Sequence, residues 1–164
     1  MKNKVILTAL FLFGFVILPA QSRAGTDDKE KLAIKKVLIE SYVEGIYVNR
    51  DSLAVKKGFH PDFLMHVYHK GRLIKADLGT WLARLKLDGK KNPKSIQHKF
   101  VIIDLTGNSS FVKMEIYEDS KHIYTDYFGL YNFKDGWKIV SKIFYGHELR
   151  QYLRQIKLEQ VNTQ

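Results

Sequence analysis

In the stretch YTDYFGLYNFKDGWKIVSKIFYGH, at positions 124–147, two aromatic-rich runs flank a charged turn. The first run carries the acid Asp126 and the second carries the base Lys142. Two strand-like stretches flank residues 134–136, Lys-Asp-Gly, whose glycine suits a left-handed position in a hairpin loop. The sequence therefore predicts a β-hairpin with a three-residue loop that carries a carboxylate and an ammonium near its middle.

This loop sets the expected register of the hairpin, because it pairs Phe133 with Trp137. Lys142 then lies opposite Phe128 and diagonal to Asp126, within reach of a long side chain. Alternation predicts one face made of Asp126, Phe128, Leu130, Val140, Lys142 and Phe144. The other face is predicted to hold Tyr127, Gly129, Tyr131, Phe133, Trp137, Ile139, Ser141 and Ile143.

Two interpretations of the charged residues stay open. An isolated charge is costly to bury, so Asp126 and Lys142 should pair, either as a structural ion pair that fixes the register or as charges at a solvated rim. Alternatively, the pair borders a cavity in which Asp126 acts as a general base, with its pKa tuned by burial and by Lys142.

The six histidines form no motif with the spacing of metal ligands. His66 and His69 are three residues apart on an expected strand and should point to opposite faces, so we predict no metal site. His66 would share a face with Leu64 and Tyr68, which indicates a buried core histidine more than a catalytic one. Without cysteine, a G-x-S-x-G sequence or a glycine-rich phosphate loop, the chain predicts no nucleotide-dependent or triad chemistry and no cofactor.

Hydrophobic periodicity predicts three helices before the main strands. Asp27-x-x-Glu30 resembles a capping box that opens a helix reaching about Val48. Asp51 is expected to cap a short second helix that Gly58 stops, and Asp77 a third. The buried face of this third helix is predicted to be Leu78, Trp81, Leu82 and Leu85.

The remaining stretches predict strands, loops and one more helix. Phe59-His60-Pro61-Asp62 should form a bend, because the residue before a proline favours extended geometry. A short hairpin is expected at 64–69 and 72–74, and a polar loop at 87–95. Four long antiparallel strands are predicted at Ile96–Leu105, Ser110–Glu118, His122–Phe133 and Trp137–Tyr145, followed by a basic helix at 147–159.

The N-terminus has the pattern of a secretory signal peptide. Lys2 and Lys4 precede an apolar run at 5–18, and the small residues Ser22 and Ala24 precede Gly25. A run of 14 residues is shorter than the roughly 20 that a membrane-spanning helix needs. We therefore expect residues 1–24 to be cleaved, leaving a periplasmic or secreted protein with no stable membrane anchor.

The net charge of the 164-residue chain is +10, and the loss of Lys2, Lys4 and Arg23 leaves 24 bases against 17 acids. A basic surface can bind phosphates. However, the bases are scattered, and their one local cluster, at Lys86, Lys90, Lys91 and Lys94, is expected to be a solvated loop. We predict no nucleic-acid partner, while attraction to an anionic ligand or membrane surface stays open.

Three segments together resemble the putative lumazine-binding branch of the nuclear transport factor 2-like superfamily. They are residues 59–62, 124–127 and 135–144, and the resemblance covers about residues 28–147. It implies a single α+β domain at 25–147, a cone-shaped, curved and mostly antiparallel sheet wrapped around N-terminal helices, with a basic tail at 148–164. It also implies an apolar cavity and a homodimer, which would cover the second aromatic-rich face of the strands.

The resemblance also suggests which residues form the site. Isomerases of this superfamily use a carboxylate with tyrosine donors in an apolar pocket, which here implies Asp126 with Tyr42, Tyr117 or Tyr127. The expected ligand-binding residues are Tyr42, Trp81, His98, Tyr117, Tyr127 and Lys142. We expect an exported domain that binds a small ligand or a partner through its cone; the alternative is a cofactor-free isomerase, dehydratase or cyclase with Asp126 as base and His66 or a tyrosine as acid.

Overall fold

The computed structural model describes residues 23–85 and 87–147; the predicted signal peptide, Lys86 and the basic tail lie largely outside them. The helical elements are α1 (Arg23–Val37), η1 (Leu38–Val48), α2 (Ser52–Gly58) and α3 (Leu78–Leu85). The strands are β1 (Phe59–His69), β2 (Arg72–Asp77), β3 (Ile96–Thr106), β4 (Ser109–Glu118), β5 (Lys121–Phe133) and β6 (Gly136–Gly146).

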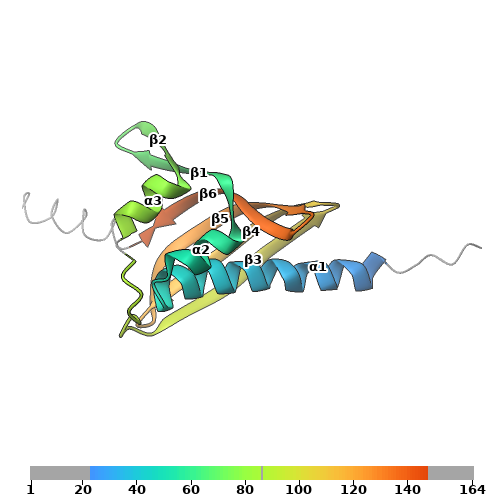
Figure 1. Cartoon of the computed structure of the whole chain (residues 1–164), viewed down its shortest axis with the longest axis horizontal. Helices are drawn as coiled ribbons and strands as arrows, with labels where there is room; N and C mark the ends of the chain where they lie inside the picture. Colours follow the sequence, from blue (N-terminus) through green and yellow to red (C-terminus); the bar gives the residue numbers. More distant parts are fainter. Residues whose placement is uncertain (1–22, 86, 148–164) are drawn as a thin grey trace, which may run out of the picture.

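The six strands form one sheet in the order β2-β1-β6-β5-β4-β3. All neighbours are antiparallel except β1 and β6, which are parallel. The sheet is curved and open, and the helices pack against one of its faces, called the inner face below (Figure 1). This architecture confirms the predicted α+β class. In the described part of the chain, no helix is both long and apolar enough to cross a membrane.

The first helix begins earlier than the sequence indicates. Because α1 already starts at Arg23, Asp27 lies inside it and the predicted capping box is wrong. Glu30 has a different partner: its Oε2 accepts hydrogen bonds from Trp137 Nε1 at 2.6 Å and from Asn132 Nδ2 at 3.2 Å. These bonds tie the helix to the β5–β6 hairpin.

The second half of this helix, η1, is a π-helix, with backbone hydrogen bonds between residues five apart. At its end, Asn49 N donates to Glu44 O at 2.7 Å. In an α-helix, residues five apart point roughly 140° away from each other. In η1, by contrast, Tyr42 and Tyr47 lie on one side, with their rings edge to face.

The helix caps at Asp51 and Asp77 are confirmed. Asp51 accepts a hydrogen bond from Leu53 N at 2.8 Å, and Asp77 accepts one from Thr80 N at 2.7 Å. Gly58 ends α2 as expected, but its backbone is not in the left-handed conformation. Instead, a β-carbon on Gly58 would lie 2.2 Å from Ser41 Oγ, so the glycine allows α2 to approach η1 closely.

The β5–β6 turn contains two residues, not the predicted three. Phe133 pairs with Gly136, which has a φ of 103°, and Lys134-Asp135 make the turn. A register shift follows, in which Val140 is the extra residue of β6. This bulge restores the predicted pairing of Phe128 with Lys142.

Because of the bulge, the predicted assignment of β6 residues to the two faces of the sheet is partly wrong. Trp137 and Ile139 were expected on the face opposite Asp126, but both lie in the core, at 4% and 0% exposure. They precede the bulge, whereas Lys142 follows it, so strict alternation fails between them. Val140, predicted on the face of Asp126, is only half-buried and lines an outer-face pocket.

Candidate functional site

A fully buried ion pair lies on the inner face of the sheet. Lys142 Nζ is 2.8 Å from Asp126 Oδ1, and the two side chains are 4% and 0% exposed. The pairing of Asp126 with Phe144 and of Phe128 with Lys142 places the acid and the base on neighbouring strands, one step apart. The predicted ion pair is therefore present, and it lies inside the fold rather than at a rim.

The second carboxylate oxygen receives a hydrogen bond from the helix. Tyr42 OH donates to Asp126 Oδ2 at 2.6 Å, and the hydroxyl groups of Tyr42 and Tyr47 are 2.9 Å apart. Oδ1 has no hydrogen bond of regular geometry, so its contact with Lys142 is chiefly ionic. A connected polar chain thus runs from half-buried Tyr47 to buried Lys142.

Aromatic rings surround the ammonium group. Five ring centroids lie between 4.3 and 6.0 Å from Lys142 Nζ, within the range of cation–π attraction. They belong to Phe144, Tyr42, Trp81, Tyr124 and Phe128. These rings offset part of the hydration that Lys142 loses on burial.

Burial governs the ionisation of the network. It lowers the pKa of Lys142, and the neighbouring Asp126 opposes that change without cancelling it. Burial, followed by the negative charge of Asp126, raises the pKa values of Tyr42 and Tyr47 well above the usual value of 10.0. Both tyrosines are therefore hydrogen-bond donors, not phenolates, at neutral pH.

The interior around the pair is filled by side chains. Asp126, Tyr42 and Phe128 are each 0% exposed, and Trp81 of α3 is 8% exposed. Half-buried residues lie beside this filled interior. His98 and Tyr124 are each paired with Ile116 across the strands, so they share one row of the sheet near Tyr47. We call Tyr47, His98, Tyr124 and Phe144 the mouth.

Only some of the predicted site residues gather here. Asp126, Lys142, Tyr42 and Trp81 form the centre, and His98 lies at the mouth, where burial lowers its pKa. Three others face away, on the outer face of the sheet, and are wrong as parts of this site: His66, Tyr117 and Tyr127.

Each of these three has surroundings of its own. His66 pairs with Ile143, the residue after Lys142, and therefore points to the opposite face of the sheet. There it is half-buried, whereas the sequence predicted a core position. Tyr117 OH donates to Glu115 Oε2 at 2.8 Å, and Tyr127 stacks on Phe111. None of them can exchange a proton with Asp126 across the sheet.

The outer face carries a pocket of about 340 Å³. Its lining combines hydroxyl groups, one carboxylate and two half-exposed rings, from Asp104, Thr106, Ser109, Ser110, Phe111, Tyr131 and Ser141 among others. Gly129 lies at the pocket, and a β-carbon there would be 2.6 Å from Ser141 Oγ. The sequence did not predict this pocket, which is separated from Asp126 by the sheet itself.

Sequence reasoning missed Tyr47, Tyr124, Phe128 and Phe144 as members of the site. Alternation had placed Phe128 and Phe144 on the face of Asp126, so the contacts of their rings with Lys142 could have been predicted from it. Tyr47 could not be, because its contact with Tyr42 depends on the π-helix. Within residues 23–85 and 87–147, no three potential ligand side chains lie close enough to hold a metal ion.

Solved structures described as nuclear transport factor 2-like share the fold of this chain. One such protein from Shewanella baltica is 22% identical with a TM-score of 0.63, covering 73% of this chain and 95% of its own. Another, from Silicibacter pomeroyi, is 16% identical with a TM-score of 0.63, covering 74% and 98%. A third, from Methylobacillus flagellatus, is 20% identical with a TM-score of 0.58, covering 77% and 94%. All three are described as being of unknown function.

Within that class, the chain belongs to the putative lumazine-binding family, whose sequence model matches residues 29–145. The resemblance predicted from three short segments is thereby confirmed over most of the chain. No curated protein matches the sequence. Family and fold together suggest a small-ligand-binding domain.

Proposed function

We propose that this protein is an exported, non-catalytic domain that binds a small, flat, partly apolar ligand at the mouth of its cone. The observation that carries the proposal is the fully buried Asp126–Lys142 pair inside a shell of five rings. A buried ion pair seldom improves stability over well-packed apolar side chains. Its presence in the interior of a ligand-binding fold is better explained by recognition.

The mouth offers suitable chemistry for such a ligand. Tyr47 and Tyr124 present half-buried ring surfaces, and His98 and the Tyr47 hydroxyl supply polar contacts. Behind them, Lys142 is already paired with Asp126, so it acts on a ligand only as one end of a buried dipole. The ligand class is therefore a planar, partly apolar molecule with a polar edge.

The test is native mass spectrometry of the protein purified from its host, under gentle and then denaturing conditions. A small molecule bound at fixed stoichiometry, lost on denaturation, is the expected result. Its absence, together with no change in tryptophan fluorescence when a panel of planar heteroaromatic acids is added, would contradict the proposal.

A matched pair of variants locates the site. Lys142→Met should abolish co-purification while keeping a side chain of similar length in the core. Lys138→Met changes the same residue type on the same strand, where the ammonium bonds Asp135 and Lys57 O at the surface. This control should retain the ligand.

The alternative function is an enzyme with Asp126 as general base. The Tyr42–Asp126 pair supplies the donor and carboxylate that proton transfer in an apolar pocket requires. However, each carboxylate oxygen already faces a donor group and the side chain is 0% exposed. The contacts favour binding, and a proton-exchange assay on the co-purified molecule, with Asp126→Asn as the blank, distinguishes the two.

We also infer that the protein is a homodimer through its outer face. An isologous contact needs projecting and hollow parts on one surface. Phe111 and Tyr131 project there at 45% and 48% exposure, beside the pocket near Gly129. A second copy is the occupant that fits both features.

Analytical ultracentrifugation tests the dimer. Phe111→Arg should shift the protein to a monomer, because a charge would be buried in the contact without a partner. Leu53→Arg places the same charge on α2, where Leu53 is 67% exposed, and should leave the dimer intact. A monomeric parent protein would refute this inference.

Export is supported by the sequence of residues 1–24 and is tested separately. N-terminal sequencing of the protein from its host should begin at Gly25. An intact Met1 would contradict export by this route.

A further inference from the structure

The β1–β2 hairpin projects from the body of the molecule at the edge of the sheet (Figure 1). Its turn is Lys70-Gly71, with φ values of 47° and 77°, as in the tight turns that suit twisted hairpins. A β-carbon on Gly71 would meet no atom within 4 Å, so the turn stands in open space.

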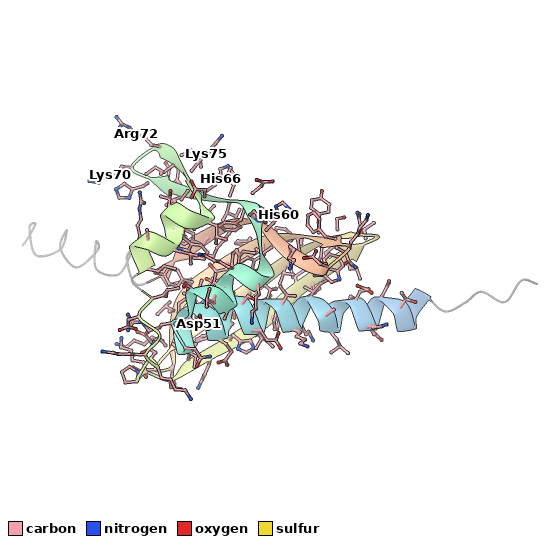
Figure 2. The ribbon with its side chains drawn as sticks, in the orientation of Figure 1. Asp51, His60, His66, Lys70, Arg72 and Lys75 are labelled. Atoms are coloured by element: carbon pink, nitrogen blue, oxygen red, sulfur yellow. The ribbon has the colours of Figure 1, made fainter. Side chains whose placement is uncertain are left out.

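The end of this hairpin is strongly basic. Lys70, Arg72 and Lys75 all lie on it, and residues 63–76 contain no acid. Figure 2 shows Lys70 and Arg72 at the tip and Lys75 further back, all three pointing outward. Among the described residues, no carboxylate lies within ion-pair distance of these three side chains.

The same tip exposes large apolar side chains on both of its faces. Tyr68 and Leu73 pair across the two strands and are 77% and 64% exposed. Ile74, the next residue, therefore points to the opposite face and is 40% exposed. A protein partner covers one face of a ribbon, whereas a lipid headgroup layer surrounds a projecting tip on all sides.

We propose that the β1–β2 hairpin binds reversibly to an anionic membrane surface. Lys70, Arg72 and Lys75 contact lipid phosphates, while Tyr68, Leu73 and Ile74 enter the headgroup region, where amphipathic rings and aliphatic chains are stabilised. This site is separate from the mouth and does not depend on the ligand. One such tip gives a weak, salt-sensitive association and no stable anchor.

The test is co-sedimentation with phosphatidylcholine vesicles, with and without added phosphatidylglycerol. We expect binding only to the anionic vesicles, weakening as salt is raised, because screening shortens the range of the attraction. All variants are purified from the same exporting host, so that every arm carries the same N-terminus.

Replacing Lys70, Arg72 and Lys75 together by Gln should weaken binding about a hundredfold, since each cation near an anionic surface contributes roughly a fivefold change. The matched control replaces the exposed Lys56, Lys90 and Lys91 by Gln, with the same loss of charge elsewhere, and should bind like the parent. Tyr68→Ser with Leu73→Ser should weaken binding by about tenfold. These positions are exposed, and circular dichroism checks that each variant is folded.

Three outcomes overturn the proposal. The first is a parent protein that does not sediment with anionic vesicles. The second is an equal loss in the hairpin variant and its control, which would mean attraction by net charge alone. The third is binding to soluble polyglutamate as strong as to vesicles and insensitive to the apolar double variant, which would indicate an acidic protein partner.

Discussion

On the inner face of β5 and β6, Asp126 and Lys142 are 0% and 3% exposed, whereas on the outer face Tyr131 and Ile143 are 48% and 51% exposed. Antiparallel sheets usually show the reverse, with apolar residues inside and polar residues in water. Here the same two strands bury charges and expose rings and aliphatic chains. The buried charges agree with the proposed recognition role of the inner face, and the exposed side chains agree with the proposed dimer contact on the outer face.

Removing one of the two buried charges is the strongest test of the difference between the two faces. Asp126→Asn should lower the free energy of unfolding by about 3–5 kcal/mol, because Lys142 is left buried without a countercharge. Asp104→Asn, an acid exposed on the outer side of β3, should change it by less than about 0.5 kcal/mol. Urea denaturation measures both. An Asp126→Asn variant as stable as the parent would mean that the carboxylate is kept for its chemistry.

Replacing both inner charges should recover much of that loss. Asp126→Leu combined with Lys142→Met removes the desolvation cost and keeps the volume, so the double variant should exceed Lys142→Met in stability by about 2 kcal/mol. A double-mutant cycle by urea denaturation gives the coupling energy. Strictly additive losses would show that the two groups do not stabilise each other.

Two glycines test whether the helix side and the outer face are packed equally tightly. Gly58→Ala should cost about 1–3 kcal/mol, because its β-carbon would lie 2.2 Å from Ser41 Oγ and 2.5 Å from Ser41 Cβ. Gly129→Ala meets only the end of the Ser141 side chain at 2.6 Å, with every other contact near 3.9 Å, and should cost less than about 1 kcal/mol. If both variants lowered the melting temperature equally, the helix side and the outer face would be packed equally tightly.

The smallest effect concerns pH. Burial raises the pKa values of Tyr42 and Tyr47, so above about pH 10 the unfolded chain releases protons that the native state keeps, and stability falls as pH rises. Burial lowers the pKa of Lys142, so between this lowered pKa and about pH 10 its contribution to stability rises with pH. The contribution of these three groups should therefore be greatest near pH 10, measured by urea unfolding across a pH series.

Tyr47→Phe sharpens the pH test. The variant keeps the ring against Tyr42 and Tyr124 but has no proton to lose, so the decline above pH 10 should become shallower. If the loss of stability above pH 10 stayed the same, it would come from groups other than Tyr47.

The sequence predicted the parts of this fold that depend on local rules. Aspartates at helix starts, strand alternation and glycines in turns identified most elements at 51–146 to within a few residues. The bend predicted at 59–62 is wrong, because β1 already begins at Phe59. The pairing of Phe128 with Lys142 was also predicted, but for an incomplete reason: the real turn is one residue shorter, and the bulge at Val140 compensates. Bulges and turn lengths depend on energies that periodicity does not express.

The candidate site was predicted only in part, and the errors share a cause. Asp126 and Lys142 were found because a charge on an apolar face needs a partner, and Tyr42 was suggested by the family resemblance. Tyr117 and Tyr127 were chosen for their residue type, although alternation from Asp126 already placed Tyr127 on the other face. Tyr47 required the π-helix, whose hydrogen-bond pattern leaves no mark in the hydrophobic spacing.

The bulge at Val140 has a consequence for aligning relatives of this protein. A relative with the same two-residue turn but an unbroken β6 would pair Phe128 with the residue at position 141 and Asp126 with that at position 143. Its inward positions would then correspond to Ser141 and Ile143, and Lys142 would have no equivalent inside. An alignment should therefore permit a one-residue gap at 140 before a missing lysine is taken as the loss of the ion pair.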